Sequence, residues 1–526
     1  MAKKHYLLLF AKIGVFIFSL FVLINSVKTH YSFINYPYQH EYREGAALAI
    51  TQLYLENKNP YKMEYQPQNT YVYGFLYPRI VSILANFFGN TLSLHRWVTY
   101  VFFLLSCTVI FFTLIRLKLN PYFAFAAAVI LHQSFVNAGV TPIARPEGLG
   151  IFLFVLGILI PWHFSFSRFS LLVSIVFGIL GYLSKPYYFL VIPLIGLYLI
   201  LFVSKRKGIG YGLASILAVL IMIVATYSVY EVYHNNTFFH HRNTAVYKFS
   251  WMKEQLLQFM EVNTVLLLLI LLSAWFIIKK FILVNYKNTV ENTVNNFRNK
   301  FIINYAHFNK EPLIKCDYNP LFIFVFMWVI FLFIIKLGGH TGNYGGVYLY
   351  HLASPFLVLL TFQFIRVFEN TYSQIIVALF LIFTLSFQFK VVSYDWNTFS
   401  SCYKNIETKI SEHQHVLNSP EVVSIMIAQN KPVYNSGLSE YFPTGISKLS
   451  LILGASKGVE EREQAYLNDI NEKVNRKEFD LMLLTKGFFS YLGDTAILKQ
   501  NYQCSDTLCA PMFYDKFEVE TWYPKK

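Results

Sequence analysis

The sequence predicts an all-α polytopic membrane protein that ends in a small α/β domain. The chain has 526 residues, of which 55% are hydrophobic, 18% aromatic and only 14% charged, and its mean hydropathy is +0.42. Apolar runs of about 20 residues, the length of a membrane-spanning helix, recur through the first three-quarters of the chain. From about residue 395 the composition becomes that of a soluble domain. We therefore expect a transmembrane domain over 1–394 and a soluble domain over 395–526.

The N-terminal segment predicts a retained first span that starts in the cytoplasm. Lys3 and Lys4 precede an apolar stretch, residues 6–27, which is too long for the h-region of a signal peptide and has no A-x-A-like cleavage site after it. The formal net charge is +15, and the basic residues cluster in short connections between spans. Such clustering sets membrane orientation. We therefore expect a multi-pass protein of the inner (plasma) membrane that has the lipid bilayer, and no nucleic acid, as a partner.

Two weaker segments follow the first span, and both are predicted to lie in the membrane interface. The segment 71–89 is long enough to span, but Pro78 and Arg79 lie near its middle. A central arginine costs roughly 2.5–3.5 kcal/mol on insertion, whereas an interfacial helix keeps Arg79 in water. The segment 41–56 is shorter and begins with two acidic residues. We expect interfacial helices inside one long outer loop, residues 36–90.

With this loop outside, about eleven spans place the short basic connections on one side of the membrane. The most basic connection, from Lys279 to Lys315, then lies in the cytoplasm, and the C-terminal domain is extracytoplasmic. The expected spans are 6–27, 97–114, 122–136, 148–162, 169–183, 187–203, 210–230, 264–278, 321–335, 347–365 and 375–389.

Local patterns in the C-terminal part predict both helices and strands. Ser419 followed by Pro420 is typical of a helix start. The apolar runs 431–434 and 479–484 suit buried strands, and 460–474 suits a polar-rich helix. No pair of the five cysteines has C-x-x-C spacing, so a zinc site is not expected. Cys504 and Cys509 either form a disulfide in an extracytoplasmic tail or stay reduced.

Acidic residues of the first outer loop are candidates for chemistry. Glu41 and Glu44 are three residues apart, so they share one helix face if both are helical. The alternative is a solvated first turn, where acids complement the helix dipole. His240 and His241 are adjacent in a loop, and we interpret them as solvated residues rather than metal ligands.

The predicted topology brings further charged groups to the same outer side as the two glutamates. Arg145, Glu147 and Lys185 lie at span ends, and a glycine-rich loop adds His340 and Asn343. Charges at such positions are functional candidates. A local ion pair would also explain Arg145 and Glu147, and snorkelling to the interface would also explain Lys185.

The combination suits transfer of a sugar from a polyprenyl phosphate to an acceptor hydroxyl. A carboxylate takes the acceptor proton as general base, and basic groups stabilise the charge that develops on the leaving phosphate. The lipid tail lies between spans while its head group reaches the outer surface. No G-x-x-x-x-G-K-[ST] loop is present, so no nucleotide site is expected.

Six short motifs resemble the GT-C integral-membrane glycosyltransferases that use polyprenyl-phosphate sugars. The resemblance is nearest to bacterial relatives of the protein O-mannosyltransferases (glycosyltransferase family 39) and of the aminoarabinose transferases. It extends along the whole chain in order, but each motif is short. The motifs are E-G-A-A-L at 44–48, N-P-Y at 59–61, Y-G-F-L-Y-P at 73–78, R-P-E-G-L at 145–149, S-K-P-Y at 184–187 and G-N-Y at 342–344.

The resemblance implies inversion at the anomeric carbon and an acidic general base in the first outer loop. Glu44, in E-G-A-A-L, is the first choice for this base and Glu41 the second. Glutamate stands here where aspartate is common in the family, which leaves open which of the two acids is the base. Some relatives use a divalent metal and others do not, so the cofactor is left open. The expected acceptor is a cell-surface glycan, a lipid or a protein. The residues expected to bind substrate are Tyr73, Arg145, Glu147, Lys185, His340, Asn343 and Tyr344.

Two other functions fit parts of the sequence. A transporter or lipid flippase would need no general base, and it often contains internal repeats, of which none is evident here. A non-catalytic scaffold would act through its soluble tail alone. A flippase would tolerate Glu44→Gln, whereas a scaffold predicts that the tail alone would rescue a deletion.

Overall fold

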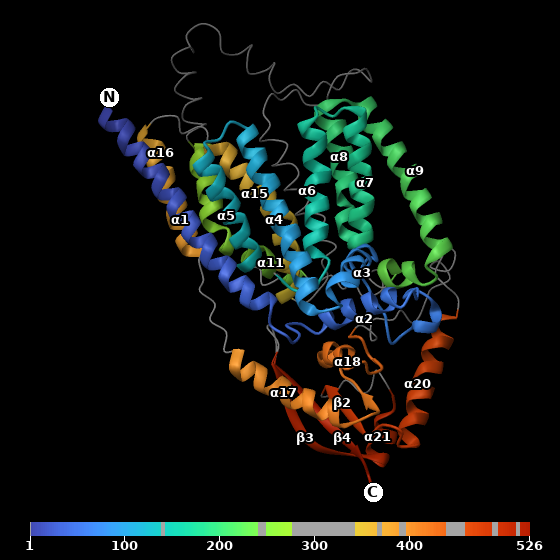
Figure 1. The fold of residues 1–526 in the computed structure, drawn as a ribbon. Helices are drawn as coiled ribbons and strands as arrows, with labels where there is room; N and C mark the ends of the chain where they lie inside the picture. Colours follow the sequence, from blue (N-terminus) through green and yellow to red (C-terminus); the bar gives the residue numbers. More distant parts are fainter. Residues whose placement is uncertain are drawn as a thin grey trace.

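The computed structural model describes residues 2–137, 142–239, 249–275, 342–365, 371–388, 396–437, 458–485, 493–511 and 516–526. Over these residues the chain is mostly helical, and a small sheet lies near the C-terminus. The helical bundle forms one end of the molecule and carries the N-terminus, and the sheet and its helices form the other end (Figure 1). The expected boundary between the two parts, 394/395, falls outside the described residues.

Long apolar helices run side by side through the upper part of the molecule in Figure 1. A 3-10 turn, η2 (Pro186–Leu190), and a π-helical turn, η3 (Leu199–Val203), flank one of them, α8. The helices are α1 (Ala2–Ile34), α4 (Leu92–Arg116), α5 (Pro121–Asn137), α6 (Glu147–His163), α7 (Arg168–Ser184), α8 (Val191–Tyr198), α9 (Lys205–Val229), α11 (Phe249–Val262), α15 (Gly342–Ile365) and α16 (Thr371–Gln388).

Four helical stretches in the described residues are long and apolar enough to cross a membrane: Tyr6–Ile34, Leu92–Arg116, Pro186–Val203 and Lys205–Val229. Other expected spans that fall at least partly within the described residues are helical, and most of them form apolar helices of 10–17 residues. The expected span 321–335 lies outside the described residues. The membrane character is therefore supported, whereas the count of about eleven spans is not confirmed.

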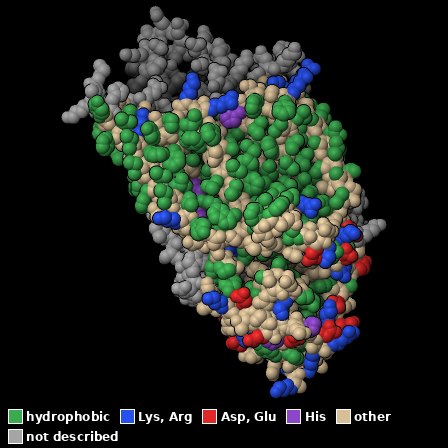
Figure 2. All heavy atoms as spheres, viewed as in Figure 1, with side chains coloured by type: hydrophobic (Ala, Val, Ile, Leu, Met, Phe, Trp, Pro, Cys, Tyr) green, Lys and Arg blue, Asp and Glu red, His purple; other side chains and the backbone are tan. Residues whose placement is uncertain are grey.

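The outer surface of the bundle is apolar, as expected of helices that face lipid. Figure 2 shows hydrophobic side chains covering this end of the molecule, while charged side chains gather over the C-terminal end. Individual residues on the apolar face are largely exposed; Phe10 and Phe169 are 80% and 77% exposed. An exposed apolar surface of this kind is typical of a protein that contacts a membrane. The lipid-facing side chains account for part of the hydrophobic composition of the chain.

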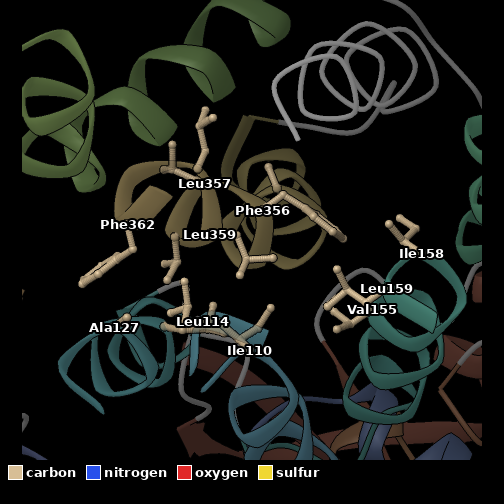
Figure 3. Close-up of a cluster of buried hydrophobic side chains, with 14 of the residues drawn as sticks. Ile110, Leu114, Ala127, Val155, Ile158, Leu159, Phe356, Leu357, Leu359 and Phe362 are labelled. Carbon is tan, nitrogen blue, oxygen red and sulfur yellow. The ribbon is translucent and has the colours of Figure 1, made fainter. Parts of the chain in front are cut away.

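The core of the bundle forms where α15 packs between two groups of helices. Figure 3 shows Phe356 and Leu359 of α15 among side chains from α4, α5 and α6, and all of these residues are buried. The labelled partners include Ile110 and Leu114 of α4 and Val155 of α6. Interlocking of these side chains fixes how the helices sit relative to one another.

Two short helices lie across the lower end of the bundle, between it and the C-terminal part (Figure 1). These are α2 (Arg43–Leu55) and α3 (Leu76–Phe88), with a 3-10 turn, η1 (Met63–Tyr65), between them. With 13 residues, α3 is about 20 Å long, which is shorter than the roughly 30 Å of a hydrocarbon core. Arg79 is exposed, whereas Tyr77 and Val81 are buried. These features agree with the interfacial helix expected over 71–89.

The C-terminal part is a four-stranded mixed sheet with helices packed beside it. The strand order is β1-β2-β4-β3, in which β1 and β2 are parallel and the other pairs antiparallel. The strands are β1 (Val416–Leu417), β2 (Leu481–Thr485), β3 (Tyr502–Pro511) and β4 (Lys516–Pro524). The helices are α17 (Trp396–Glu412), η5 (Pro420–Val422), α18 (Val423–Ala428), α20 (Val459–Asn475) and α21 (Thr495–Asn501).

Most local predictions for this domain are confirmed, and one is wrong. Strand β2 and helix α20 match the predicted 479–484 and 460–474, and η5 begins directly after Ser419. The predicted strand 431–434 is irregular, because the backbone N–H of Tyr434 donates to the Asn418 side chain instead of a neighbouring strand. Cys504 is a free thiol. It shares β3 with Cys509, about 16 Å away at 3.3 Å per residue, which is too far for a disulfide.

Candidate functional site

The two candidate glutamates, Glu41 and Glu44, lie in different local structures. Helix α1 ends at Ile34 and α2 begins at Arg43, so Glu41 belongs to the turn that precedes α2 while Glu44 belongs to its first turn. The expectation that both side chains share one helix face is therefore wrong. Glu41 precedes the first residue of α2 by two positions and lies in a turn, so the two carboxylates face different partners.

Glu44 is completely buried and every hydrogen bond at its carboxylate comes from a fixed donor. One oxygen accepts from Arg96 Nε at 2.9 Å and from the backbone N–H of Ala144 at 2.7 Å. The other oxygen accepts from Arg96 Nη2 at 2.8 Å and from the backbone N–H of His40 at 2.6 Å. Burial alone would raise the pKa of Glu44, but the charge and hydrogen bonds of Arg96 lower it to about 2. A carboxylate held in this way is a structural group and a weak base.

Arg96, at the start of α4, ties the whole turn to the helical bundle. Its side chain is fully buried. Nη1 donates to the Tyr36 carbonyl at 2.6 Å and Nη2 to the Tyr38 carbonyl at 2.7 Å. Together with the two bonds to Glu44, these contacts fix the turn on both sides of Glu41.

Glu41 has a different environment, which suits a proton acceptor. Its carboxylate lies 3.1 Å from Arg43 Nη1 and 3.9 Å from Arg145 Nη1. These are ion pairs without hydrogen-bond alignment, since within the described residues neither oxygen of Glu41 accepts a well-aligned hydrogen bond. Burial raises the pKa of Glu41 against the opposing effect of the two arginines. The carboxylate of Glu41 is thus more basic than that of Glu44, and it accepts fewer hydrogen bonds from the described residues.

The R-P-E and S-K-P motifs meet beside Glu41. Glu147 Oε1 lies 2.9 Å from Arg145 Nη2 and accepts from Lys185 Nζ at 2.6 Å. Arg145 Nη2 also donates to the Tyr73 hydroxyl at 2.9 Å, and Lys185 Nζ lies 4.5 Å from the centre of the Tyr73 ring. Five expected site residues, from four separate segments of the chain, therefore form one continuous cluster.

Close backbone contacts between helices hold the cluster together. The backbone N–H of Gly74 donates to the Ser184 carbonyl at 3.0 Å, and a Cβ atom at position 74 would lie 1.8 Å from the Leu183 carbonyl oxygen. Only glycine permits this approach, which places Tyr73 against Lys185. On the other side, the Thr99 hydroxyl donates to the Arg145 carbonyl at 2.8 Å.

Among the residues that the structure describes, the charges in this cluster do not cancel. The ion pairs join Glu41 and Glu147 to Arg43, Arg145 and Lys185, so ionised carboxylates leave a formal excess of one positive charge. Glu41, Arg145, Glu147 and Lys185 are each at most 5% exposed. The alternatives of a solvated acidic turn and a snorkelling lysine are therefore wrong. A buried positive excess attracts an anion, for which phosphate is the common biological example.

Several expected residues are not described at this site. His340, and the loop residues His240 and His241, lie outside the described residues. Asn343 and Tyr344 fall in the first turn of α15, but the positions of their side chains are not described. A cavity of about 220 Å³ lies elsewhere, between the first outer loop and α20, and its walls include Gln68, Tyr434, Arg462 and Lys473.

Sequence reasoning missed two arginines that matter here. Arg43 lies between the two glutamates in the sequence, where an ion pair with either was a visible possibility. Arg96 stands directly before the expected span 97–114, so it fulfilled the same span-end criterion that singled out Lys185. Neither arginine belongs to one of the six resemblance motifs, so the sequence alone does not mark them as candidate site residues.

Comparison with known proteins adds no family assignment: no protein-family model matches the chain, and no curated protein sequence matches it. Within the described residues, no three His, Cys, Asp or Glu side chains gather as a metal-binding group. The geometry of the Glu41 cluster is therefore the feature that points to a function.

Proposed function

We propose that the protein is a membrane glycosyltransferase that moves a sugar from a polyprenyl-phosphate donor to an acceptor hydroxyl. The observation that supports this most directly is Glu41. It is a buried carboxylate whose two oxygens accept no well-aligned hydrogen bond from the described residues, and it lies beside a cluster with an excess of positive charge. A base and an anion-binding group side by side are the two components that such a transfer needs.

In the proposed reaction the acceptor oxygen attacks the anomeric carbon while the bond from that carbon to the phosphate oxygen breaks. The acceptor proton moves to a carboxylate oxygen of Glu41, and the electron pair of the broken bond stays on the phosphate. Arg145 and Lys185 stabilise the negative charge that develops there. Glu147 holds both cations, and Tyr73 orients Arg145 through its hydroxyl. Attack from the face opposite the phosphate inverts the anomeric configuration.

The assignment of Glu41 as base changes the order of preference between the two glutamates. Glu44 was the first choice because it belongs to the E-G-A-A-L motif. Its four hydrogen-bond donors and its pKa of about 2 instead favour a structural role. General bases work best when their pKa lies near the working pH, and the raised pKa of Glu41 moves in that direction.

We place the cluster on the outer face of the inner membrane. Lys205, Arg206 and Lys207 lie at the N-terminus of α9, and Figure 2 shows Lys and Arg side chains along the rim of the apolar surface farthest from the C-terminal domain. If that rim is cytoplasmic, as the positive-inside rule predicts, the Glu41 cluster and the C-terminal domain both lie outside. The polyprenyl tail then reaches the site from the bilayer.

The test is transfer by the purified protein in lipid nanodiscs that contain a panel of polyprenyl-phosphate sugars. Transfer to an added hydroxyl acceptor is followed by mass spectrometry, with Glu41→Gln as the inactive variant. Glu56→Gln is the matched control, because Glu56 lies in the same loop and its carboxylate is exposed and paired with Lys58. Transport of intact lipid without any sugar transfer, unaffected by Glu41→Gln, would instead support the flippase alternative.

A further inference from the structure

The turn that carries Glu41 is held from a second side, by the C-terminal domain. Gln39, two residues before Glu41, is completely buried. Its Nε2 donates to the Pro420 carbonyl at 3.1 Å, and its Oε1 accepts from the backbone N–H of Ser424 at 2.9 Å. One side-chain amide of the membrane domain therefore bonds with a donor and an acceptor of the C-terminal domain at the same time.

The Ser424 contact fills a gap in the C-terminal domain itself. The first N–H groups of a helix have no partner within the helix and usually bond to a capping side chain. Ser424 is the second residue of α18, so its N–H is one of these groups. Within the described residues, neither η5 nor α18 has a side-chain cap. Gln39 supplies the missing acceptor from the other domain, so the start of α18 and the Glu41 turn become ordered together.

Two further contacts lie on either side of Gln39. The Tyr38 hydroxyl donates to Glu407 Oε2 at 2.8 Å, and the Tyr38 ring stacks on Tyr403 with centroids 4.7 Å apart. At the start of α2, a Cβ atom at Gly45 would lie 2.6 Å from Val423 Cβ. The C-terminal domain thus contacts the chain on both sides of Glu41, at Tyr38 in the turn and at Gly45 in α2.

We propose that Gln39 is a positioning residue through which the C-terminal domain sets the geometry of the Glu41 carboxylate. The proposal rests on the function proposed above. Arg96 fixes the backbone of the turn from the bundle side, and Gln39 fixes it from the domain side. A general base that is misplaced by 1 Å can lose about 100-fold in rate, so an unanchored turn would retain substrate but react slowly.

The experiment compares wild-type protein, Gln39→Leu and the matched control Gln429→Leu in nanodiscs. Gln429 lies at the other end of α18 and donates to the Glu407 carbonyl within the C-terminal domain. For each protein, donor turnover is measured together with hydrogen exchange of peptides that cover α18. Gln39→Leu is expected to lower kcat by about 10- to 100-fold with the donor KM nearly unchanged, and to speed exchange at the start of α18. The control is expected to leave kcat near that of wild type.

If Gln39→Leu turns over like wild type, the positioning role is overturned while the proposed function stands. If wild-type protein transfers no sugar from any donor, the proposed function fails, and the exchange data still report whether Gln39 orders α18. If Gln39→Leu does not fold, Tyr38→Phe replaces it, since this change removes only the hydroxyl that bonds to Glu407. A smaller fall in kcat is then expected, and an unchanged kcat overturns the positioning role.

Discussion

Replacing each outer-loop glutamate by glutamine separates a structural carboxylate from a catalytic one. In Glu44→Gln, the new NH2 group must take the place of one carboxylate oxygen. Each of those oxygens now accepts from one Arg96 N–H and one backbone N–H. In either orientation, the amide NH2 therefore faces two hydrogen-bond donors. The substitution also leaves the buried Arg96 charge without its counter-ion.

The size of the expected loss follows from the burial of the pair. Both side chains are 0% exposed, and removal of one partner from such a pair costs about 3–5 kcal/mol. The depressed pKa gives a consistent value: a shift from 4.5 to about 2 corresponds to about 3 kcal/mol at neutral pH. Glu41→Gln breaks no aligned hydrogen bond, so its effect on stability is expected to be much smaller.

The assay measures two quantities for both variants in nanodiscs: the apparent unfolding temperature and the transfer rate of the folded fraction. Glu44→Gln is expected to unfold at a clearly lower temperature but to keep activity in the protein that remains folded. Glu41→Gln is expected to unfold near the wild-type temperature and to lose about 10²- to 10⁴-fold in rate. The reverse pattern, with Glu44→Gln stable and inactive and Glu41→Gln active, would refute this assignment of roles.

Four further predictions concern the residues around the two glutamates. Arg96→Met should destabilise the protein by about 3–5 kcal/mol. The double variant with Glu44→Leu should recover part of that loss. If the destabilisations of the two single variants simply add in the double variant, the Arg96–Glu44 ion pair does not have the proposed structural role. Lys185→Met removes a cation from the phosphate site and should slow transfer by about 10²-fold or more with little change in acceptor KM, whereas Lys58→Met serves as the control. The transfer rate should rise with pH through the raised pKa of Glu41, because the base acts when ionised, and Glu41→Asp should move the midpoint of that rise. Stability should change at acidic pH. The lowered pKa of Glu44 stabilises the fold above about pH 4.5, and this contribution is lost as the pH falls toward 2.

The sequence was sufficient for the parts of the fold that depend on local pattern. Hydropathy predicted a helical membrane part, and the position of Arg79 in 71–89 correctly predicted a short helix that leaves this side chain exposed. Sequence also predicted α20 and β2, because their patterns are strong over a whole element. The run 431–434 has an apolar pattern too, but whether it forms a strand depends on a neighbour, and Asn418 takes its backbone N–H.

The site itself depended on contacts that no local pattern contains. The motif residues Tyr73, Arg145, Glu147 and Lys185 do come together, as we expected from their positions at span ends. The roles of the glutamates were not readable, because they depend on Arg96, a residue 52 positions from Glu44. The role of Gln39 depends on Ser424, 385 positions away. Such pairs become visible only when the domains are seen packed together.

The most direct test of the central claim is mass spectrometry of lipid-linked sugars in a strain that lacks the protein. The proposed function predicts that one polyprenyl-phosphate sugar accumulates, that wild-type protein restores the normal level, and that Glu41→Gln does not restore it although it is present in the membrane. An unchanged lipid-linked sugar profile in that strain, or full restoration by Glu41→Gln, would contradict glycosyl transfer by the Glu41 cluster.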